Sequence, residues 1–145
     1  MKIVDVNILL YAVNPDASHH DRIIGWWEKV LNGDETIGLA WAVVLGFLRV
    51  STNPRAFPEP LTPERAVDQI DAWLALDVVS PVAETRDHWR ILRGLVTETG
   101  VAGNLAADAH LAALAVTHGA TLASCDGDFA RFQGLRWENP LRGPS

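Results

Sequence analysis

The sequence predicts an α/β fold built on a parallel sheet. Short runs rich in Val, Ile and Leu alternate with longer segments of helical periodicity, and this alternation is typical of β-α-β units. The chain has 145 residues, of which 48% are hydrophobic, so it is long enough for one core and too apolar to be disordered. We therefore expect one domain over residues 1–145, with a central parallel sheet of four to five strands.

The expected strands are short apolar segments that end at turn residues. The first leads into a turn at Asn7, and the fourth follows Gly119, which stops the helix before it. The segments are Lys2–Val6, Thr36–Ala40, Asp77–Ser80, Thr121–Ala123 and, as a short fifth strand, Leu135–Trp137.

The expected helices are marked by their start and stop residues. Ser18 can cap a helix that stops at Asn32-Gly33, and Thr62-Pro63-Glu64 combines an N-cap, a proline at N1 and an acid in the first turn. The Pro-rich stretch 53–61 is expected to be a surface loop. The helical segments are Ile8–Val13, His19–Leu31, Trp41–Val50, Thr62 to about Ala75, Thr85–Glu98 and Leu105–His118.

Charge and composition exclude several classes of protein. The net charge of −6 argues against a general nucleic-acid binder, which would carry a basic face. A nuclease site, however, is itself a carboxylate cluster that accepts phosphate after cations bind, so an RNA substrate stays compatible with this charge. The single cysteine, Cys125, excludes a disulfide framework, and no apolar run approaches the roughly 18–20 residues of a membrane span. We expect a soluble, cytoplasmic protein with no membrane association.

Three aspartates are expected to meet at one edge of the sheet. Asp5 lies near the end of the first strand and Asp126 follows the fourth, and ligands of open parallel sheets bind outside the carboxyl ends of strands. Asp108 lies in the first turn of an otherwise apolar helix, where a charge is costly unless it is paired or metal-bound. Asp128 adds a fourth carboxylate and Asn7 a neutral oxygen. Such a hard oxygen site suits Mg²⁺ or Mn²⁺.

Each acid also has a purely structural interpretation. Asp5 could cap the helix after the first strand, and Asp108 could be a first-turn acid that the helix dipole stabilises. Asp126 and Asp128 could be turn residues around Gly127. The joint arrangement is more specific than any one of the four.

Six segments resemble a known family, with matching order and spacing over nearly the whole chain. They resemble PIN-domain proteins, and in particular the VapC-type toxin ribonucleases of VapBC toxin–antitoxin systems. In chain order they are Val4–Ala12, Gly46–Arg55, Asp108–Ala115, His118–Ala120, Ser124–Phe129 and Phe132–Trp137.

The resemblance implies a fold, an activity and partners. The fold would be a PIN-like three-layer α/β/α sandwich, and the activity hydrolysis of RNA phosphodiester bonds with Mg²⁺ or Mn²⁺. Asp5, Asp108 and Asp126 match the family's catalytic, metal-binding acids. The implied partners are RNA, a VapB-like antitoxin whose basic tail neutralises the acids, and a second copy of the chain within the toxin–antitoxin complex.

One position departs from the family pattern. Many PIN domains carry a glutamate in the helix after the second strand, and this chain has Gly46 there, in a segment without any acid. Either Asp128 or water completes the site, or this branch works with fewer ligands.

Four further residues are candidates for contacts around the metal or with the substrate. Arg49 could contact a phosphate or form a structural salt bridge, and Asn104 could touch metal-bound water, although capping its helix is the favoured interpretation. Asn7 and Ser124 lie beside the acids that follow the first and fourth strands.

Two other functions remain open at this point. A degenerate PIN domain that binds RNA or a partner without cleavage is kept open by Gly46. A metal-dependent phosphatase would use Asp5 as nucleophile, but enzymes of that kind usually have a second aspartate where this chain has Asn7. They also need a lysine further along, and lysine occurs here only at positions 2 and 29.

Overall fold

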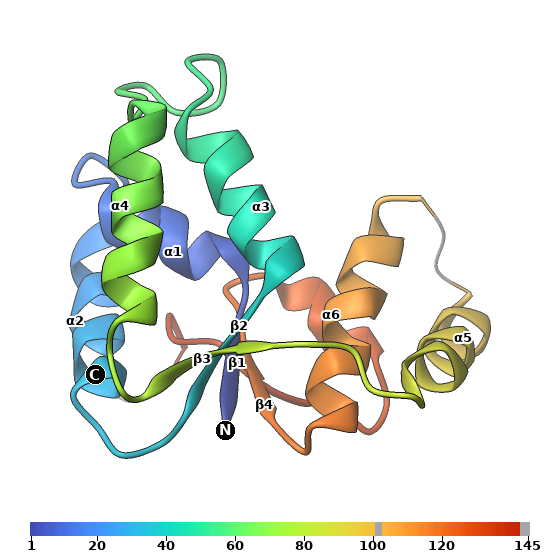
Figure 1. Cartoon of the computed structure of the whole chain (residues 1–145). Helices are drawn as coiled ribbons and strands as arrows, with labels where there is room; N and C mark the ends of the chain where they lie inside the picture. The colour runs from blue at the N-terminus through green and yellow to red at the C-terminus, as the bar shows by residue number, and fades with distance from the viewer. Residues whose placement is uncertain (101–102, 143–145) are drawn as a thin grey trace.

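A five-stranded parallel sheet in the order β3-β2-β1-β4-β5 forms the centre of the computed structural model, which describes residues 1–100 and 103–142 (Figure 1). All four pairings are parallel, as expected from the β-α-β pattern. The strands are β1 (Lys2–Val4), β2 (Ile37–Ala40), β3 (Val79–Val82), β4 (Thr121–Ala123) and β5 (Arg136–Glu138).

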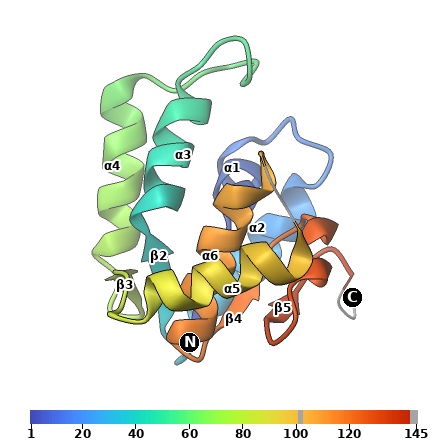
Figure 2. The ribbon, with the colours of Figure 1, turned by 90° about the vertical axis from the view of Figure 1, so that its right-hand side faces the viewer.

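Helices cover both faces of this sheet and make the three-layer sandwich that was predicted. α1 to α4 lie on one side, and α5 and α6 lie on the other, with α5 running across α6 (Figures 1 and 2). Crossovers between parallel strands are right-handed, so the helices change face when the strand order reverses direction after β3. The helices are α1 (Val6–Val13), α2 (His20–Leu31), α3 (Trp41–Ser51), α4 (Pro63–Leu74), α5 (His88–Thr99), α6 (Leu105–Thr117) and the 3-10 helix η1 (Gly127–Arg131).

Several predicted boundaries differ from the structure; the helix expected over Thr85–Glu98, for example, begins at His88. Three of the differences involve helix caps or an edge strand. β1 ends at Val4, because the Asp5 side chain accepts a hydrogen bond from Val6 N and thereby starts α1. α2 begins at His20 with no side-chain cap, so the predicted cap at Ser18 is wrong.

The third difference is in the edge strand β3, which lies two residues later than Asp77–Ser80 and contains Pro81. An edge strand tolerates proline because one side of its backbone needs no partner. The predicted start of α4 is confirmed, since Thr62 Oγ1 accepts a hydrogen bond from Arg65 N at 3.2 Å.

An aromatic cluster joins three helices on one face of the sheet. Trp73 on α4 meets Trp27 of α2 and Phe47 of α3 edge to face, with ring centroids 5.7 and 5.4 Å apart. Trp27 and Phe47 are fully buried, and this packing holds α3 against the sheet. Within residues 1–100 and 103–142, no helix is long and apolar enough to cross a membrane.

Candidate active site at the carboxyl end of the sheet

The candidate site lies where the strand order reverses, between β1 and β4. The chain leaves β1 toward β2 on one side and reaches β4 from the other, which leaves a crevice at the carboxyl ends of these two strands. Val4 pairs with Ala123, and Asp5 N donates to Ala123 O at 2.9 Å. The residues that follow the two strands are therefore brought side by side, as the sequence predicted.

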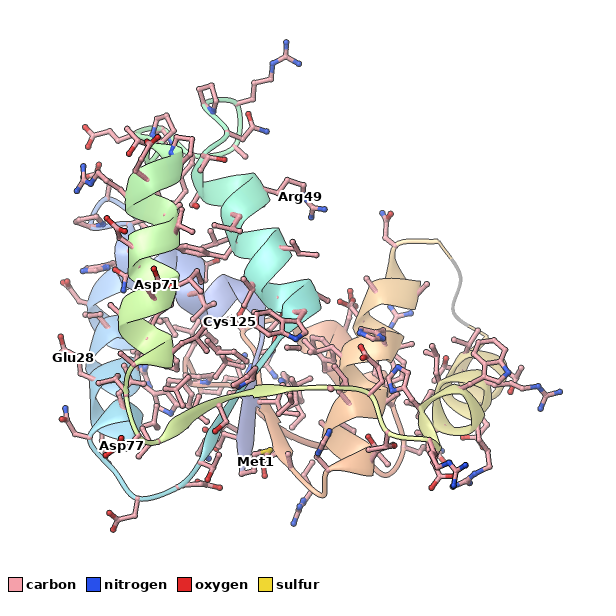
Figure 3. All side chains as sticks on the ribbon, viewed as in Figure 1. Met1, Glu28, Arg49, Asp71, Asp77 and Cys125 are labelled. Carbon is pink, nitrogen blue, oxygen red and sulfur yellow. The ribbon has the colours of Figure 1, made fainter. Side chains whose placement is uncertain are left out.

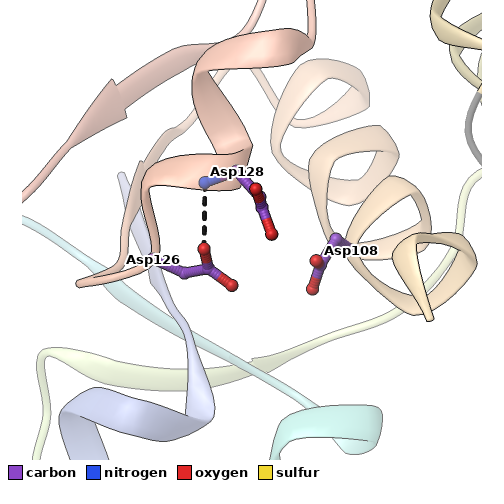
Figure 4. A group of neighbouring side chains, drawn as sticks. All are labelled: Asp108, Asp126 and Asp128. Carbon is purple, nitrogen blue, oxygen red and sulfur yellow. Dashed lines mark hydrogen bonds between the residues drawn. The ribbon is translucent and has the colours of Figure 1, made fainter.

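Three carboxylates gather in this crevice. Asp108 from α6 and Asp126 and Asp128 from the loop after β4 each offer an oxygen, and these oxygens lie within 4.8 Å of one another (Figure 4). Asp126 Oδ1 accepts from Asp128 N at 2.9 Å and so caps η1, which places both acids on one turn. The two acids are thus turn residues and members of the cluster at the same time. All three are half-buried, which suits a cation site that substrate can still reach.

Asp5 lies beside this trio and is held by the protein itself. It is 8% exposed, and its carboxylate accepts from Val6 N at 2.7 Å, Ser124 Oγ at 2.7 Å and Asn7 Nδ2 at 3.2 Å. A carboxylate has about four acceptor sites, so three hydrogen bonds leave room for one more ligand. The assignment of Asp5 as a metal ligand stays a prediction.

Ser124 and Asn7 form the frame of the site. Ser124 is fully buried, and its Oγ donates to Asp5 while it accepts from Asp126 N at 3.0 Å and Asn7 Nδ2 at 3.1 Å. Asn7 Oδ1 accepts from Cys125 N at 3.2 Å. These bonds tie the residues after β1 to the residues after β4, so both candidates have positioning roles in the structure.

The electrostatics of the cluster favour a bound cation. Burial, and then repulsion from Asp5, Asp126 and Asp128, raises the pKa of Asp108 to about 6. Burial also raises the pKa of Asp5, against the lowering effect of its hydrogen bonds from Ser124 and Val6. Carboxylates gathered in this way repel one another unless a cation or a basic side chain neutralises them. The donor set therefore fits a divalent ion with oxygen ligands.

The remaining candidates make few contacts. Arg49 is exposed on α3, where its side chain extends away from α4 (Figure 3), and it forms no salt bridge with residues 1–100 or 103–142. Asn104 is exposed at the start of α6 and makes no capping hydrogen bond, so the favoured capping interpretation is wrong. Gly46 is buried on α3, and a Cβ there would lie 3.4 Å from Val6 Cγ2. Val6 is the residue that follows Asp5 in the chain.

Sequence reasoning missed Trp137 as a part of the site. Trp137 pairs with Leu122 across β4 and β5, and its Nε1 donates to Ser124 O at 3.1 Å. The expected fifth strand, Leu135–Trp137, includes this tryptophan. Trp137 reaches Ser124 because of the register between β4 and β5. The hydrophobic pattern of the sequence does not predict that register.

Comparisons with known proteins agree with this fold. Residues 2–135 match the PIN domain family. The chain is 46% identical over 140 residues to Ribonuclease VapC37 of Mycobacterium tuberculosis, which covers 97% of each chain.

Two solved structures show the same fold. VapBC2 from Rickettsia felis, bound to a promoter DNA fragment, superposes with a TM-score of 0.72 at 21% identity, over 95% of this chain and 97% of that one. A toxin–antitoxin complex from Klebsiella pneumoniae superposes with a TM-score of 0.65 at 16% identity, over 97% and 98%.

The raised pKa of Asp108 predicts a pH-dependent cost to stability in the absence of metal. Below the unfolded-state pKa of 3.8 the group is neutral in both states. As pH rises toward about 6, the unfolded chain loses this proton first, so the folded state loses stability. In EDTA, Asp108→Asn should therefore melt at a higher temperature than wild type at pH 7, and the difference should shrink toward pH 4.

Thermal melts with millimolar Mn²⁺ at pH 7 complete this test. The metal should raise the melting temperature of the wild type and not that of Asp108→Asn. Asp71→Asn, on the exposed surface of α4, is the matched control for the change from Asp to Asn. Equal melting temperatures of wild type and Asp108→Asn in EDTA at pH 7 would show that the carboxylates do not repel one another.

Proposed function

The chain belongs to the PIN domain family and is a VapC-type member of it, and we propose on this basis that it is a divalent-metal-dependent ribonuclease. It hydrolyses RNA phosphodiester bonds and acts in the cytoplasm as the toxin of a type II toxin–antitoxin pair. The whole chain, 1–145, is taken as one PIN-like domain. The observation that carries the proposal is the gathering of Asp108, Asp126 and Asp128 within 4.8 Å beside the buried Asp5.

The roles of the residues follow from their contacts. Asp108, Asp126 and Asp128 would hold Mg²⁺ or Mn²⁺, with Asp5 as a further ligand through its remaining acceptor site. Such an ion supplies polarisation of the phosphodiester and neutralises the charge that develops during hydrolysis. Ser124 and Asn7 hold Asp5 in place, and the exposed Arg49 on α3 is available for a phosphate. Asn104, exposed one turn before Asp108, is proposed to contact solvent around the ion.

The alternatives fit the geometry less well. As a phosphatase nucleophile Asp5 would need to be open to the substrate, but it is only 8% exposed and its three hydrogen bonds leave one acceptor site. A degenerate domain that binds RNA without cleavage would require that the site, without an acid at Gly46, has too few ligands to hold a metal ion. Three other carboxylates lie within 4.8 Å without it, which favours cleavage.

Two kinds of protein partner are part of the proposal. A VapB-like antitoxin would place an arginine or lysine among the carboxylates, since the cluster needs a positive charge when metal is absent. A second copy of the chain would cover α3, where Trp41 and Leu45, one helical turn apart, are 51% and 65% exposed. Large apolar side chains exposed together are typical of interfaces.

RNA cleavage by purified, partner-free protein tests the proposed activity. Wild type should cut structured RNA with Mn²⁺ and not with EDTA. Asp108→Asn should lose more than the roughly 10–100-fold that changes around a metal site typically cost. Asp71→Asn should cut like wild type, because its side chain lies outside the cluster on α4. Cutting that persists in EDTA, or in Asp108→Asn, would contradict a metal-dependent site.

Replacement of Gly46 by glutamate tests whether the site lacks a ligand. The new Cβ would make ordinary contact with Val6, so the backbone need not move. Removal of a glycine from a helix also gains roughly 0.5–1 kcal/mol, so stability alone does not decide the question. The Mn²⁺ concentration for half-maximal cleavage should fall in Gly46→Glu and not in the neutral control Gly46→Gln.

The same measurement with Asp128→Asn shows which residue compensates. This change should raise the half-maximal Mn²⁺ concentration in the native background, and raise it less when Gly46→Glu is present. Unchanged metal dependence in Gly46→Glu would mean that position 46 does not reach the metal.

Co-expression with the product of the adjacent small gene tests the antitoxin. We expect a stable complex on size-exclusion chromatography that cuts RNA more slowly than the free protein, because a basic side chain occupies the cluster. Expression of the protein alone that leaves the host unharmed would weigh against a toxin.

A further inference from the structure

A second pocket lies between α2 and the segment that follows β5. Its volume is about 460 Å³, within the range of small-molecule sites. Trp26 and Lys29 line it from α2, and Trp137 and Arg142 line it from the C-terminal side. We refer to it as the Trp26–Trp137 pocket. None of the proposed metal-binding carboxylates lines it.

The two indole rings of this pocket are held in place. Trp26 stacks on the buried Trp27, with an interplanar angle of 20° and ring centroids 6.4 Å apart. Trp137 is held by the hydrogen bond from its Nε1 to Ser124 O. Both rings are only half-buried, so each keeps apolar surface that a ligand can cover. The pocket therefore presents aromatic surface that needs no rearrangement to bind a flat group.

The pocket also presents positive charge in a chain of net charge −6. Arg142 Cζ lies 5.8 Å from the Trp137 ring centroid, and a turn fixes its backbone, because Asn139 O accepts from Arg142 N at 2.9 Å. Lys29 is exposed in the last turn of α2. Neither cation forms a salt bridge within the part of the chain that the structure describes. Glu138, the acid of the lining, is paired with Lys2 at 2.8 Å.

The Trp26–Trp137 pocket and the acidic site share one loop. Trp137 is bonded to the backbone of Ser124, which holds Asp5. A methyl group placed on Gly127, between Asp126 and Asp128, would lie 3.9 Å from Arg142 Nη2. Arg142 of the pocket therefore lies next to the loop that carries Asp126 and Asp128.

We propose that the Trp26–Trp137 pocket binds an unstacked nucleotide of single-stranded RNA, in the strand whose phosphodiester bond is cut at the acidic site. A base stacks on the exposed indole surface, and Lys29 and Arg142 contact the phosphates of the backbone. This inference rests on the proposed ribonuclease function. The combination of aromatic faces with unneutralised cations is that of single-stranded nucleic-acid sites. An apolar protein interface would instead be depleted in lysine.

The experiment measures binding of a fluorescein-labelled single-stranded RNA by anisotropy, in an Asp126→Asn background that prevents cleavage. Lys29→Gln with Arg142→Gln should weaken binding about tenfold or more, and should reduce the slope of log K against log salt by about 1.4, two phosphate contacts' worth. Trp26→Leu keeps an apolar residue on α2 and should weaken binding about tenfold with an unchanged salt slope.

A matched control removes two other exposed cations. Arg86→Gln with Arg93→Gln changes the same net charge beside and on α5, on the opposite side of the sheet from α2 (Figures 1 and 2). RNA affinity in this control should stay at the level of the background protein. Melting temperatures of all variants show that each is folded. Trp137 is left intact because its hydrogen bond to Ser124 positions the acidic loop.

Each outcome bears on the inference separately from the ribonuclease assignment. Wild type that cuts RNA, with pocket variants that bind RNA as tightly as the control, overturns the pocket and leaves the activity standing. Wild type that never cuts RNA, with binding that depends on the pocket, overturns the activity and upholds the RNA site.

Equal losses of RNA affinity in the pocket variants and in the control would mean a diffuse charge effect, and would overturn the proposed pocket site. Pocket variants that keep RNA affinity but lose the co-expressed partner would make the pocket a protein-docking surface, and also overturn it.

Discussion

The hydrogen bond from Ser124 Oγ to Asp5 Oδ2, 2.7 Å long and closed to solvent, joins the two segments on which the acidic site is built. A hydroxyl can donate one hydrogen bond and accept two, and Ser124 uses all three, with Asp5, Asp126 N and Asn7 as partners. A fully satisfied buried network of this kind permits one arrangement of its members. The positions of Asp5 and Asp126 therefore depend on each other, although 121 residues separate them in the chain.

This rigidity has an electrostatic consequence. The network holds Asp5 and Asp126 close to each other without the help of a cation. The pKa of Asp108, raised to about 6 by burial and by the neighbouring acids, is the local measure of the cost of gathering these acids. Stability given up at a site of this kind is recovered when a cation or a basic side chain binds. A metal ion and a basic antitoxin tail would then compete for the same place, because the same repulsion favours both.

The sequence predicted the parts of this site that follow from periodicity and from strand ends. Asp5 and Asp126 were placed together because both follow strands of one parallel sheet, and the five parallel strands confirm that argument. The cap at Thr62 was predictable because proline and an acid follow it. Ser18 and Asn104 have equally suitable side chains but form no cap. α2 begins two residues after Ser18, and Asn104 directly precedes α6 but has a helical backbone (φ −61°, ψ −25°) and no side-chain cap hydrogen bond.

The parts that could not be predicted depend on register and on short-range turn geometry. The shift of β3 by two residues follows from its pairing with β2, where Ala40 meets Val82, and no local pattern encodes that pairing. The 3-10 turn that brings Asp128 to Asp126 depends on one side-chain cap.

The place of the positive charges matters for RNA binding, because the protein as a whole is acidic. A net charge of −6 repels a polyanion at long range, and the carboxylate cluster repels it most strongly at the point of cleavage. Affinity must then come from short-range contacts, because stacking is insensitive to charge and a cation acts only within a Debye length of about 10 Å. Lys29, Arg142 and the two indole rings line one pocket, of which Arg142 reaches the loop of Asp126 and Asp128, and they provide such contacts without making the rest of the surface basic. The result expected of this arrangement is weak binding to RNA in general, and productive binding only where an unstacked nucleotide and a reachable phosphodiester occur together.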